Sequence, residues 1–181
     1  MSGTITLKTE RLELRRHRME DARPLHEDFG RDEKMFEFSG WNPYATREQA
    51  AETVQGFLDG YARDENAEGH FYGWAIDHQG ELAGTIGAYD YDAAANSIEI
   101  GCSIARRYWG KGFASEAIRA VLEYLLEEEQ IDRVTAWCAA DNIGSVRAME
   151  KAGMALVSRE EGALEIGGKT YDKLNYAATK G

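Results

Sequence analysis

The stretch Ile98-Glu-Ile-Gly-Cys-Ser-Ile-Ala-Arg-Arg-Tyr-Trp-Gly-Lys-Gly-Phe113 decides the fold of this chain, because it predicts a strand, a tight loop and a helix in succession. Apolar side chains recur at every second position up to Ile104, which is typical of a strand. Gly110 and Gly112 can adopt the positive φ values of a tight turn, and they leave the main chain open to a ligand. The following apolar residues are spaced as on one face of a helix: Phe113, Ala114, Ala117, Ile118, Val121, Leu122 and Leu125. The helix is therefore predicted to begin at or just after Gly112.

The loop has the features of an anion site. The first turn of a helix has about four unpaired N–H groups and the positive end of the helix dipole, which together attract phosphate or pyrophosphate. A Gly-x-Gly by itself more often marks only a tight turn. The loop is too short for the Gly-x-x-x-x-Gly-Lys-Ser/Thr motif, and it lacks the third glycine of the dinucleotide fingerprint. Neither nucleotide-binding motif therefore fits.

Two segments resemble the GNAT superfamily of N-acetyltransferases. Arg107-Tyr-Trp-Gly-Lys-Gly112 resembles its acetyl-CoA pyrophosphate loop, Arg/Gln-x-x-Gly-x-Gly/Ala. The longer string 106–117 is similar to the branch that acetylates the N-termini of ribosomal proteins. Asn142-Ile-Gly-Ser-Val-Arg-Ala-Met-Glu-Lys-Ala-Gly-Met154 resembles the Asn-x-x-Ser-x-x-x-x-x-Lys-x-Gly-Phe segment of the same superfamily. The order of the two segments makes the pair specific, and the resemblance extends from Thr9 to Tyr176.

The resemblance implies a binding site for acetyl-CoA as cosubstrate, with no metal ion. It implies that main-chain N–H groups of the loop hold the pyrophosphate, namely those of Trp109, Gly110, Lys111, Gly112, Phe113 and Ala114. It also implies that the strand edge near Ile104 pairs with the pantetheine amides, where this strand diverges from its parallel neighbour. Asn142 resembles a residue that holds the pantetheine arm, although it could be a plain N-cap. The side chains of Arg107 and Lys111 add positive charge to the loop, although both could simply be solvated.

Acetyl transfer to an amine needs a base, because an amine is mostly protonated at neutral pH. Glu99 is predicted to take the proton, directly or through water, since it is the one carboxylate inside the strand before the loop. A glutamate at a sheet edge that faces solvent is the alternative.

The departing thiolate needs a proton or a hydrogen bond. Many members of the superfamily have a tyrosine for this at the position of Met149, so this chain lacks the usual acid. The resemblance suggests Ser145 instead, whose high pKa suits a hydrogen bond or a relay through water. Ser145 could equally serve only to pair the N-terminus of its helix.

The rest of the chain predicts one mixed sheet. Short turns connect the strands 71–77, 81–90 and 97–104 as an antiparallel meander. The strand 133–138 follows the helix and should run parallel to 97–104 through a right-handed crossover. Further strands are predicted at 10–16, 155–163 and 170–177, and further helices at 19–29, from Thr46 to about Tyr61, and at 143–152. The predicted fold class is α/β in the α+β sense: a mixed, mostly antiparallel seven-stranded sheet with a central splayed parallel pair and about four flanking helices, as one domain over residues 1–181.

An aromatic segment lies between the first two predicted helices. Met35–Tyr44 is rich in aromatic side chains and ends in turn residues. It could merely pack on the core. The resemblance implies that it helps to wall the acceptor groove, which makes Phe36, Trp41 and Tyr44 candidates for substrate contacts.

The composition excludes several classes of protein. The net charge of −11 over 181 residues disfavours direct contact with nucleic acid. It suits a basic acceptor, although a negative surface also serves solubility alone. No apolar run is long enough for a membrane span or a signal peptide, so a cytoplasmic protein is expected. Cys102 and Cys138 are too few for a disulfide framework, and they are expected to fill the core. The acidic run Glu127–Glu129 is expected to form a solvated face.

The hypothesis is an acetyl-CoA-dependent N-acetyltransferase that works by direct attack through a tetrahedral intermediate. The favoured acceptor is a protein or peptide N-terminus, by resemblance. A small amine such as a polyamine, amino acid or aminoglycoside is the first alternative. A non-catalytic module that binds acyl-CoA for regulation is the second, and both a monomer and a homodimer are compatible with the sequence.

Overall fold

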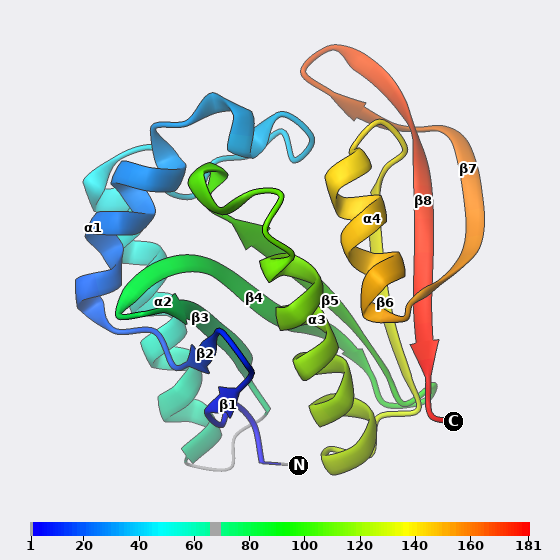
Figure 1. The fold of residues 1–181 in the computed structure, drawn as a ribbon, viewed down its shortest axis with the longest axis horizontal. Coiled ribbons are helices and arrows are strands. Elements are labelled where there is room, and N and C mark those ends of the chain that lie inside the picture. Colours follow the sequence, from blue (N-terminus) through cyan, green and yellow to red (C-terminus); the bar gives the residue numbers. More distant parts are fainter. Residues whose placement is uncertain (1, 66–69) are drawn as a thin grey trace.

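The computed structural model describes residues 2–65 and 70–181, which form one eight-stranded sheet with helices on both faces (Figure 1). The strand order is β1-β2-β3-β4-β5-β6-β8-β7. The strands are β1 Leu7–Lys8, β2 Glu13–Arg15, β3 Tyr72–His78, β4 Glu81–Asp92, β5 Ser97–Ile104, β6 Arg133–Ala139, β7 Ala155–Ile166 and β8 Lys169–Thr179. The mixed, mostly antiparallel sheet is thus confirmed. It has one strand more than predicted, because the two residues of β1 are too few to show an alternating pattern.

Four α-helices lie within the described residues: α1 Ala22–Pro24, α2 Arg47–Glu65, α3 Phe113–Glu123 and α4 Ile143–Ala152. The predicted helix at 19–29 is a composite segment, in which a 3-10 turn precedes α1 and a π turn over Leu25–Gly30 follows it. Another π turn, Tyr124–Glu128, extends α3. A capping box precedes α2, because the side chains of Thr46 and Gln49 each accept the other residue's main-chain N–H at 3.1 Å.

The two faces of the sheet are covered by different helices. Trp74 of β3 is fully buried, and its ring packs edge-on against Tyr124 at the end of α3. The preceding position along β3, Gly73, faces the other way, because a Cβ atom there would lie 3.7 Å from the ring of Phe57 on α2. Helices α3 and α4 lie on the near face in Figure 1, with α2 behind the sheet. The core therefore fills both sides of the sheet.

The parallel pair is β5 and β6, and it is short. Three register pairs join these strands, from Ser97 with Arg133 to Glu99 with Thr135. Beyond Glu99 the remaining residues of β5 pair only with β4 on the other side. The two strands therefore diverge toward their carboxyl ends, which confirms the predicted splay.

The acidic run at the end of α3 is not uniformly solvated, so that expectation is wrong for Glu129. Glu129 is only 4% exposed, and its carboxylate accepts hydrogen bonds from the hydroxyl of Tyr72 and from the N–H of Ser2. Burial would raise the pKa of Glu129, but these bonds lower it below its usual value. The carboxylate thus ties the start of the chain to the sheet, a role that depends on residues far away in sequence.

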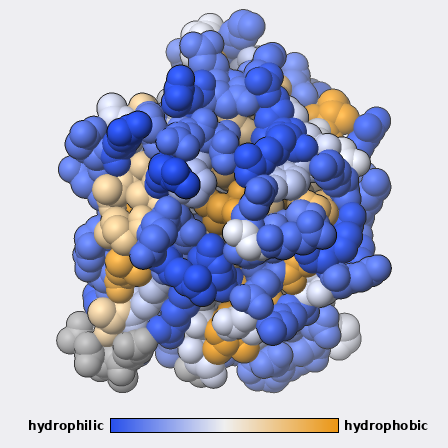
Figure 2. All heavy atoms as spheres, turned by 60° about the vertical axis from the view of Figure 1, so that its left-hand side comes forward, coloured by the Kyte–Doolittle hydropathy of each residue, from blue (hydrophilic) through white to orange (hydrophobic). Residues whose placement is uncertain are grey.

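The outer surface agrees with the charged composition. Figure 2 shows one face on which hydrophilic residues predominate and hydrophobic residues form small, separate patches. In the described part of the chain, no helix combines the length and apolar character that a membrane crossing needs.

Candidate active site

The loop between β5 and α3 has the geometry that its glycines predict. Gly110 and Gly112 have φ values of 75° and 80°, which residues with a side chain rarely adopt. A Cβ atom at Gly110 would meet no protein atom within 4 Å, so that main chain is open on one side. Gly112 caps α3, which begins at Phe113 as predicted. The first turn of α3 therefore presents N–H groups next to exposed backbone.

An N-terminal segment holds this loop in place. The carboxylate of Glu116, in the first turn of α3, accepts hydrogen bonds from the hydroxyl of Thr9 at 2.6 Å and from Nε of Arg11 at 2.7 Å. Arg11 also donates to the carbonyl of Lys111 at 2.8 Å, and its guanidinium lies 4.9 Å from the ring centre of Phe113. Burial would raise the pKa of Glu116, but these bonds lower it and so favour the ionised form. The negative charge of Glu116 then interacts favourably with the positive end of the helix dipole.

The cationic side chains of the loop already have partners. Arg107 forms ion pairs with Asp28 at 3.3 Å and Glu81 at 3.5 Å. Lys111 lies 5.2 Å from the ring centre of Tyr108. A charged hollow of about 560 Å³ separates the loop from the end of the first helical segment, and it is lined by Glu27, Asp28, Arg31, Asp32, Ala105, Arg106 and Arg107. Both cations are exposed enough to exchange these surface contacts for a phosphate.

Glu99 lies at the last paired position of β5 and β6. Its neighbours Ile98 and Ile100 are buried, so Glu99 points to the opposite face of the sheet. The indole N–H of Trp137 on β6 donates to Oε1 of Glu99 at 3.1 Å. Tyr89 on β4 is its partner in register, and the Tyr89 hydroxyl would lie 2.6 Å from a Cβ atom at Gly101. Glu99 is therefore half-buried inside the sheet, not a solvent-facing residue of the sheet edge.

Opposing effects act on the acidity of Glu99. Burial raises its pKa, and the charge of Asp90 adds to this increase. The hydrogen bond from Trp137 and the charge of Lys173 lower it, but the net change is upward. Burial also raises the pKa of the neighbouring Tyr89 hydroxyl to about 12, so Tyr89 stays neutral.

The divergence of β5 and β6 leaves main chain of β5 without a strand on one side. From Ile100 to Ile104 the strand has no register partner on β6. The carbonyl of Ile104 accepts a hydrogen bond from the indole of Trp109 at 2.6 Å. Extended backbone of this kind can pair with amide groups of a ligand, as an added strand does.

Helix α4 begins at the carboxyl end of β6. Asn142 is its N-cap, and the amide oxygen of Asn142 accepts the N–H of Ser145 at 3.3 Å. The hydroxyl of Ser145 is half-buried and has no hydrogen-bond partner among the described residues. Met149 is 4% exposed and belongs to the core. Helices α3 and α4 start at the same edge of the sheet, to which the carboxyl ends of β5 and β6 point (Figure 1).

The aromatic segment lies on the same face of the sheet as Glu99. Tyr44 is 7% exposed, packs 6.4 Å from Phe36 between ring centres, and bonds through its hydroxyl to Thr85 of β4. Trp41 is 73% exposed. The ring of Phe38, which the sequence did not single out, lies 5.6 Å from that of Tyr171 in the β7–β8 hairpin. The aromatic segment therefore contacts the β7–β8 hairpin at one end and β4 at the other.

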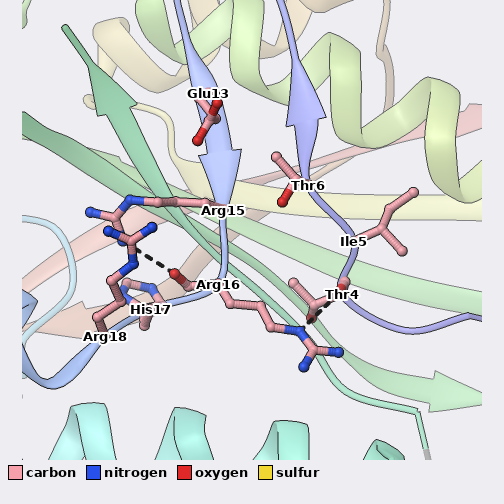
Figure 3. A pocket seen from close by; sticks show the side chains of 8 residues that line it. All are labelled: Thr4, Ile5, Thr6, Glu13, Arg15, Arg16, His17 and Arg18. Carbon is pink, nitrogen blue, oxygen red and sulfur yellow. Dashed lines mark hydrogen bonds between the residues drawn. The ribbon is translucent and has the colours of Figure 1, made fainter. Parts of the chain in front are cut away.

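A separate hollow lies away from this loop, between β1 and the end of β2 (Figure 3). It measures about 400 Å³ and is lined by Thr4, Ile5, Thr6, Glu13, Arg15, Arg16, His17 and Arg18. The guanidinium groups of Arg15 and Arg18 lie side by side, whereas Arg16 turns away and donates to the carbonyl of Thr4 at 3.1 Å. Arg15 is neutralised by Asp21 and Asp77, so this hollow is mainly a structural junction.

Neither cysteine has the low thiol pKa that a nucleophile needs. Burial raises the pKa of Cys102 to about 12 and that of Cys138 to about 11, so both remain thiols at neutral pH. Within residues 2–65 and 70–181, no group of His, Cys, Asp or Glu side chains is placed to hold a metal ion.

Three neighbours of Glu99 could not be found from the sequence. Tyr89, Trp137 and Lys173 come from β4, β6 and β8, and no motif contains them. Their spacing along the chain carries no signal, because only the register of four strands brings them together. The one local signal is the alternation of small and apolar residues along 134–138, which places Trp137 on the face opposite Ala136 and Cys138.

Comparison with known proteins identifies relatives of the whole chain. Residues 11–155 match the family described as Acetyltransferase (GNAT) domain. An uncharacterized N-acetyltransferase of Bacillus licheniformis, p20, is 30% identical over 170 residues, which cover 93% of this chain and 88% of the relative.

Solved structures share the fold. A GNAT-family acetyltransferase from Bacillus anthracis superimposes with a TM-score of 0.80 at 26% identity, over 97% of this chain and 98% of the other. RimL, a ribosomal L7/L12 alpha-N-protein acetyltransferase solved with coenzyme A, gives a TM-score of 0.83 at 20% identity, over 97% and 98% of the two chains.

Proposed function

Because the chain belongs to the GNAT family of N-acetyltransferases, we propose that it transfers an acetyl group from acetyl-CoA to the primary amine of a protein or peptide N-terminus. The position of Glu99 carries this proposal. A half-buried carboxylate with a raised pKa lies where the parallel strands separate, and sheets of this kind bind ligands beyond the carboxyl ends of such strands. A base whose pKa is nearer to neutrality is better suited to accept a proton there.

The residues around the splayed strands fit acetyl-CoA, which supplies an acetyl group activated as a thioester. The N–H groups from Trp109 to Ala114 would hold the pyrophosphate, supported by the positive φ values of the two glycines and by the start of α3. The free edge of β5 up to Ile104 would pair with the pantetheine amides, and Asn142 would hold the same arm from α4. Arg107 and Lys111 would add charge near the phosphates.

Glu99 would receive the proton of the acceptor amine, directly or through a water molecule. Its Oε1 is engaged by Trp137, which leaves Oε2 for this task. Main-chain N–H groups of the adjacent free strand edge would stabilise the oxyanion that forms during attack on the acetyl carbon.

Ser145 would donate a hydrogen bond to the departing thiolate, directly or through water. Its hydroxyl has no other hydrogen-bond partner among the described residues, and it lies in the first turn of α4, where the helix dipole favours a negative charge. Met149 is buried in the core and carries no proton to donate, so it does not replace the tyrosine of other members.

The acceptor groove would lie on the face of the sheet that carries Glu99. Phe36, Trp41 and Tyr44 would form one wall, and the β7–β8 hairpin reaches the same segment through the contact between Phe38 and Tyr171. A groove bounded by a loop and a hairpin would accommodate a peptide end, and the net charge of −11 favours a basic peptide. RimL, which shares the fold, is a ribosomal L7/L12 alpha-N-protein acetyltransferase, and this supports the same acceptor class.

The experiment that tests this function combines cosubstrate binding and turnover. The melting temperature is measured with and without acetyl-CoA, and thiol release is then followed against peptides with free N-termini, the same peptides with blocked N-termini, polyamines and free amino acids. A cosubstrate at about a hundredfold excess over its Kd should stabilise the protein by about 2.7 kcal/mol. ATP and NAD serve as matched nucleotide controls.

Each result separates the candidate functions. Thiol release that requires a free peptide N-terminus supports the proposed acceptor. Release with polyamines or amino acids alone would replace it by a small-amine acetyltransferase, and stabilisation without any release would favour a non-catalytic acyl-CoA module. Stabilisation by ATP or NAD equal to that by acetyl-CoA would contradict the assignment of the loop.

A further inference from the structure

Trp137 bridges the gap that opens between β5 and β6. The strands are paired up to Glu99 and Thr135, and Trp137 lies two positions further along β6, where β5 is no longer its neighbour. Its indole N–H nevertheless reaches Oε1 of Glu99 at 3.1 Å. Among the described residues, no other side chain donates a hydrogen bond to this carboxylate. The bond therefore determines which of the two oxygens is left free.

Lys173 supports the indole ring from β8. Its ammonium group lies 5.1 Å from the ring centre of Trp137, within the range of a cation–π interaction. A cation on the ring withdraws electron density from the indole, which makes its N–H a better donor. Lys173 pairs in register with Ala139 of β6 and with Glu160 of β7, so its backbone is fixed on both sides.

We infer that Trp137 is a positioning residue for Glu99, and that Lys173 supports it both through the contact with the indole ring and by its own charge. Indole can donate but cannot accept a hydrogen bond, so Trp137 favours the ionised carboxylate and directs Oε2 toward the acceptor amine. This inference rests on the proposed function, in which Glu99 is the base. The other groups that face Glu99 are Asp90, whose charge opposes ionisation, and the neutral Tyr89.

Trp137→Phe removes the donor and keeps an aromatic ring on the strand. Loss of a bond that favours the charged form raises the pKa of Glu99, so the acid limb of the kcat/KM profile should move to higher pH by about 0.5–1 unit. The rate constant kcat at pH 7 should fall about three- to tenfold, and the Kd for acetyl-CoA should not change. Lys173→Met should shift the acid limb in the same direction by a smaller amount.

Two comparisons exclude a merely structural effect. Tyr91→Phe is the matched control, because Tyr91 is also an exposed aromatic residue of the sheet but bonds to Asn96 instead of Glu99. It should leave the acid limb in place. In a double-mutant cycle, Trp137→Phe should slow the native enzyme but cause no further loss in the Glu99→Gln variant.

A titration without any acceptor keeps this inference separate from the proposed function. With ¹³C-labelled glutamate, the carboxyl signal of Glu99 is assigned by its loss in Glu99→Gln, and its midpoint is followed against pH by NMR. The midpoint should rise in Trp137→Phe and in Lys173→Met, even if no acceptor has been identified. An unchanged midpoint in Trp137→Phe, or an equal loss of rate with and without Glu99, would show that Trp137 only packs on the sheet.

Discussion

The side chain of Glu99 lies between groups that change its pKa in opposite directions. Burial and Asp90 raise it, whereas Trp137 and Lys173 lower it without cancelling the increase. A base must be ionised to accept a proton, so its activity is present above its pKa and is lost as the pH falls through that value. The raised pKa thus moves the loss of activity closer to neutral pH.

Glu99→Gln should separate catalysis from binding at this residue. The amide keeps the shape of the side chain but cannot accept the proton, so kcat/KM should fall by about 10²–10³ while the Kd for acetyl-CoA stays the same. The acid limb of the native kcat/KM profile should have its midpoint above 4.5, the ordinary value for a glutamate, and should be absent in the variant. A variant that retains native kcat/KM across the pH range would exclude Glu99 as the base.

At the scale of elements, the site depends on the point at which β5 and β6 stop pairing. The ladder between β5 and β6 stops after Glu99, and each strand then leads into a loop and a helix whose N-termini point to the same edge. Gly110 and Gly112 in the loop before α3 have positive φ values. The path of the chain into α3 therefore depends on residues that have no side chain. Free strand edge and helix N-termini are thus brought together by the connections between elements.

Gly110→Ala tests the close approach of a ligand to this loop. A Cβ atom in this backbone conformation costs about 1–2 kcal/mol, and no protein atom within 4 Å would clash with it. If the pyrophosphate lies against this main chain, the Kd for acetyl-CoA should rise more than tenfold, to be measured by titration calorimetry.

Gly80→Ala is the matched control for this substitution. Gly80 has a φ of 85°, likewise has no atom within 4 Å of an added Cβ, and lies in the turn between β3 and β4. It should lose similar stability and keep native affinity. Equal affinities in the two variants would place the ligand away from Gly110.

At the scale of the whole molecule, a buried ionic cluster joins the N-terminal strand to the sheet and to the first helical segment. Arg15 donates two hydrogen bonds of 2.9 Å to Asp21 and another of 3.3 Å to Asp77. Burial would raise the pKa of Asp21, but the His17 ring at 3.6 Å and the hydrogen bonds from Arg15 and Arg18 lower it well below the usual value. A carboxylate with a lowered pKa stabilises the fold above its unfolded pKa of 3.8, and this contribution is lost as the pH falls toward its folded pKa.

Asp21→Asn should therefore destabilise the protein by about 2–4 kcal/mol, since it leaves Arg15 partly unpaired in a buried place. Chemical denaturation should show the same difference at pH 5 and pH 8, because Asp21 is ionised throughout this range. Asp59→Asn, on the exposed side of α2, is the control and should stay within about 0.5 kcal/mol of the native protein. A loss below 1 kcal/mol in Asp21→Asn would contradict this account of the cluster.

The sequence by itself determined the elements that depend on neighbouring residues. The alternation in β5, the glycines before α3 and the Asn142 cap of α4 act over a few residues, so their patterns predicted those elements correctly. The order of strand, helix and strand then predicted the parallel pair and the edge at which the loop lies. The roles of Glu99, Ser145 and the loop residues remain predictions, which the variants above test.

Only the tertiary structure decided which side chains surround those residues. The contact of Trp137 with Glu99, the position of Lys173 over the indole and the burial of Glu129 all join residues that are distant in the chain. Hydrophobic periodicity specifies which face of a strand is buried, but the neighbours on a face follow from strand order and register, which the packing of the whole sheet sets. The acidity of Glu99 was hidden for the same reason, because burial, a hydrogen bond from β6 and charges on β4 and β8 determine it.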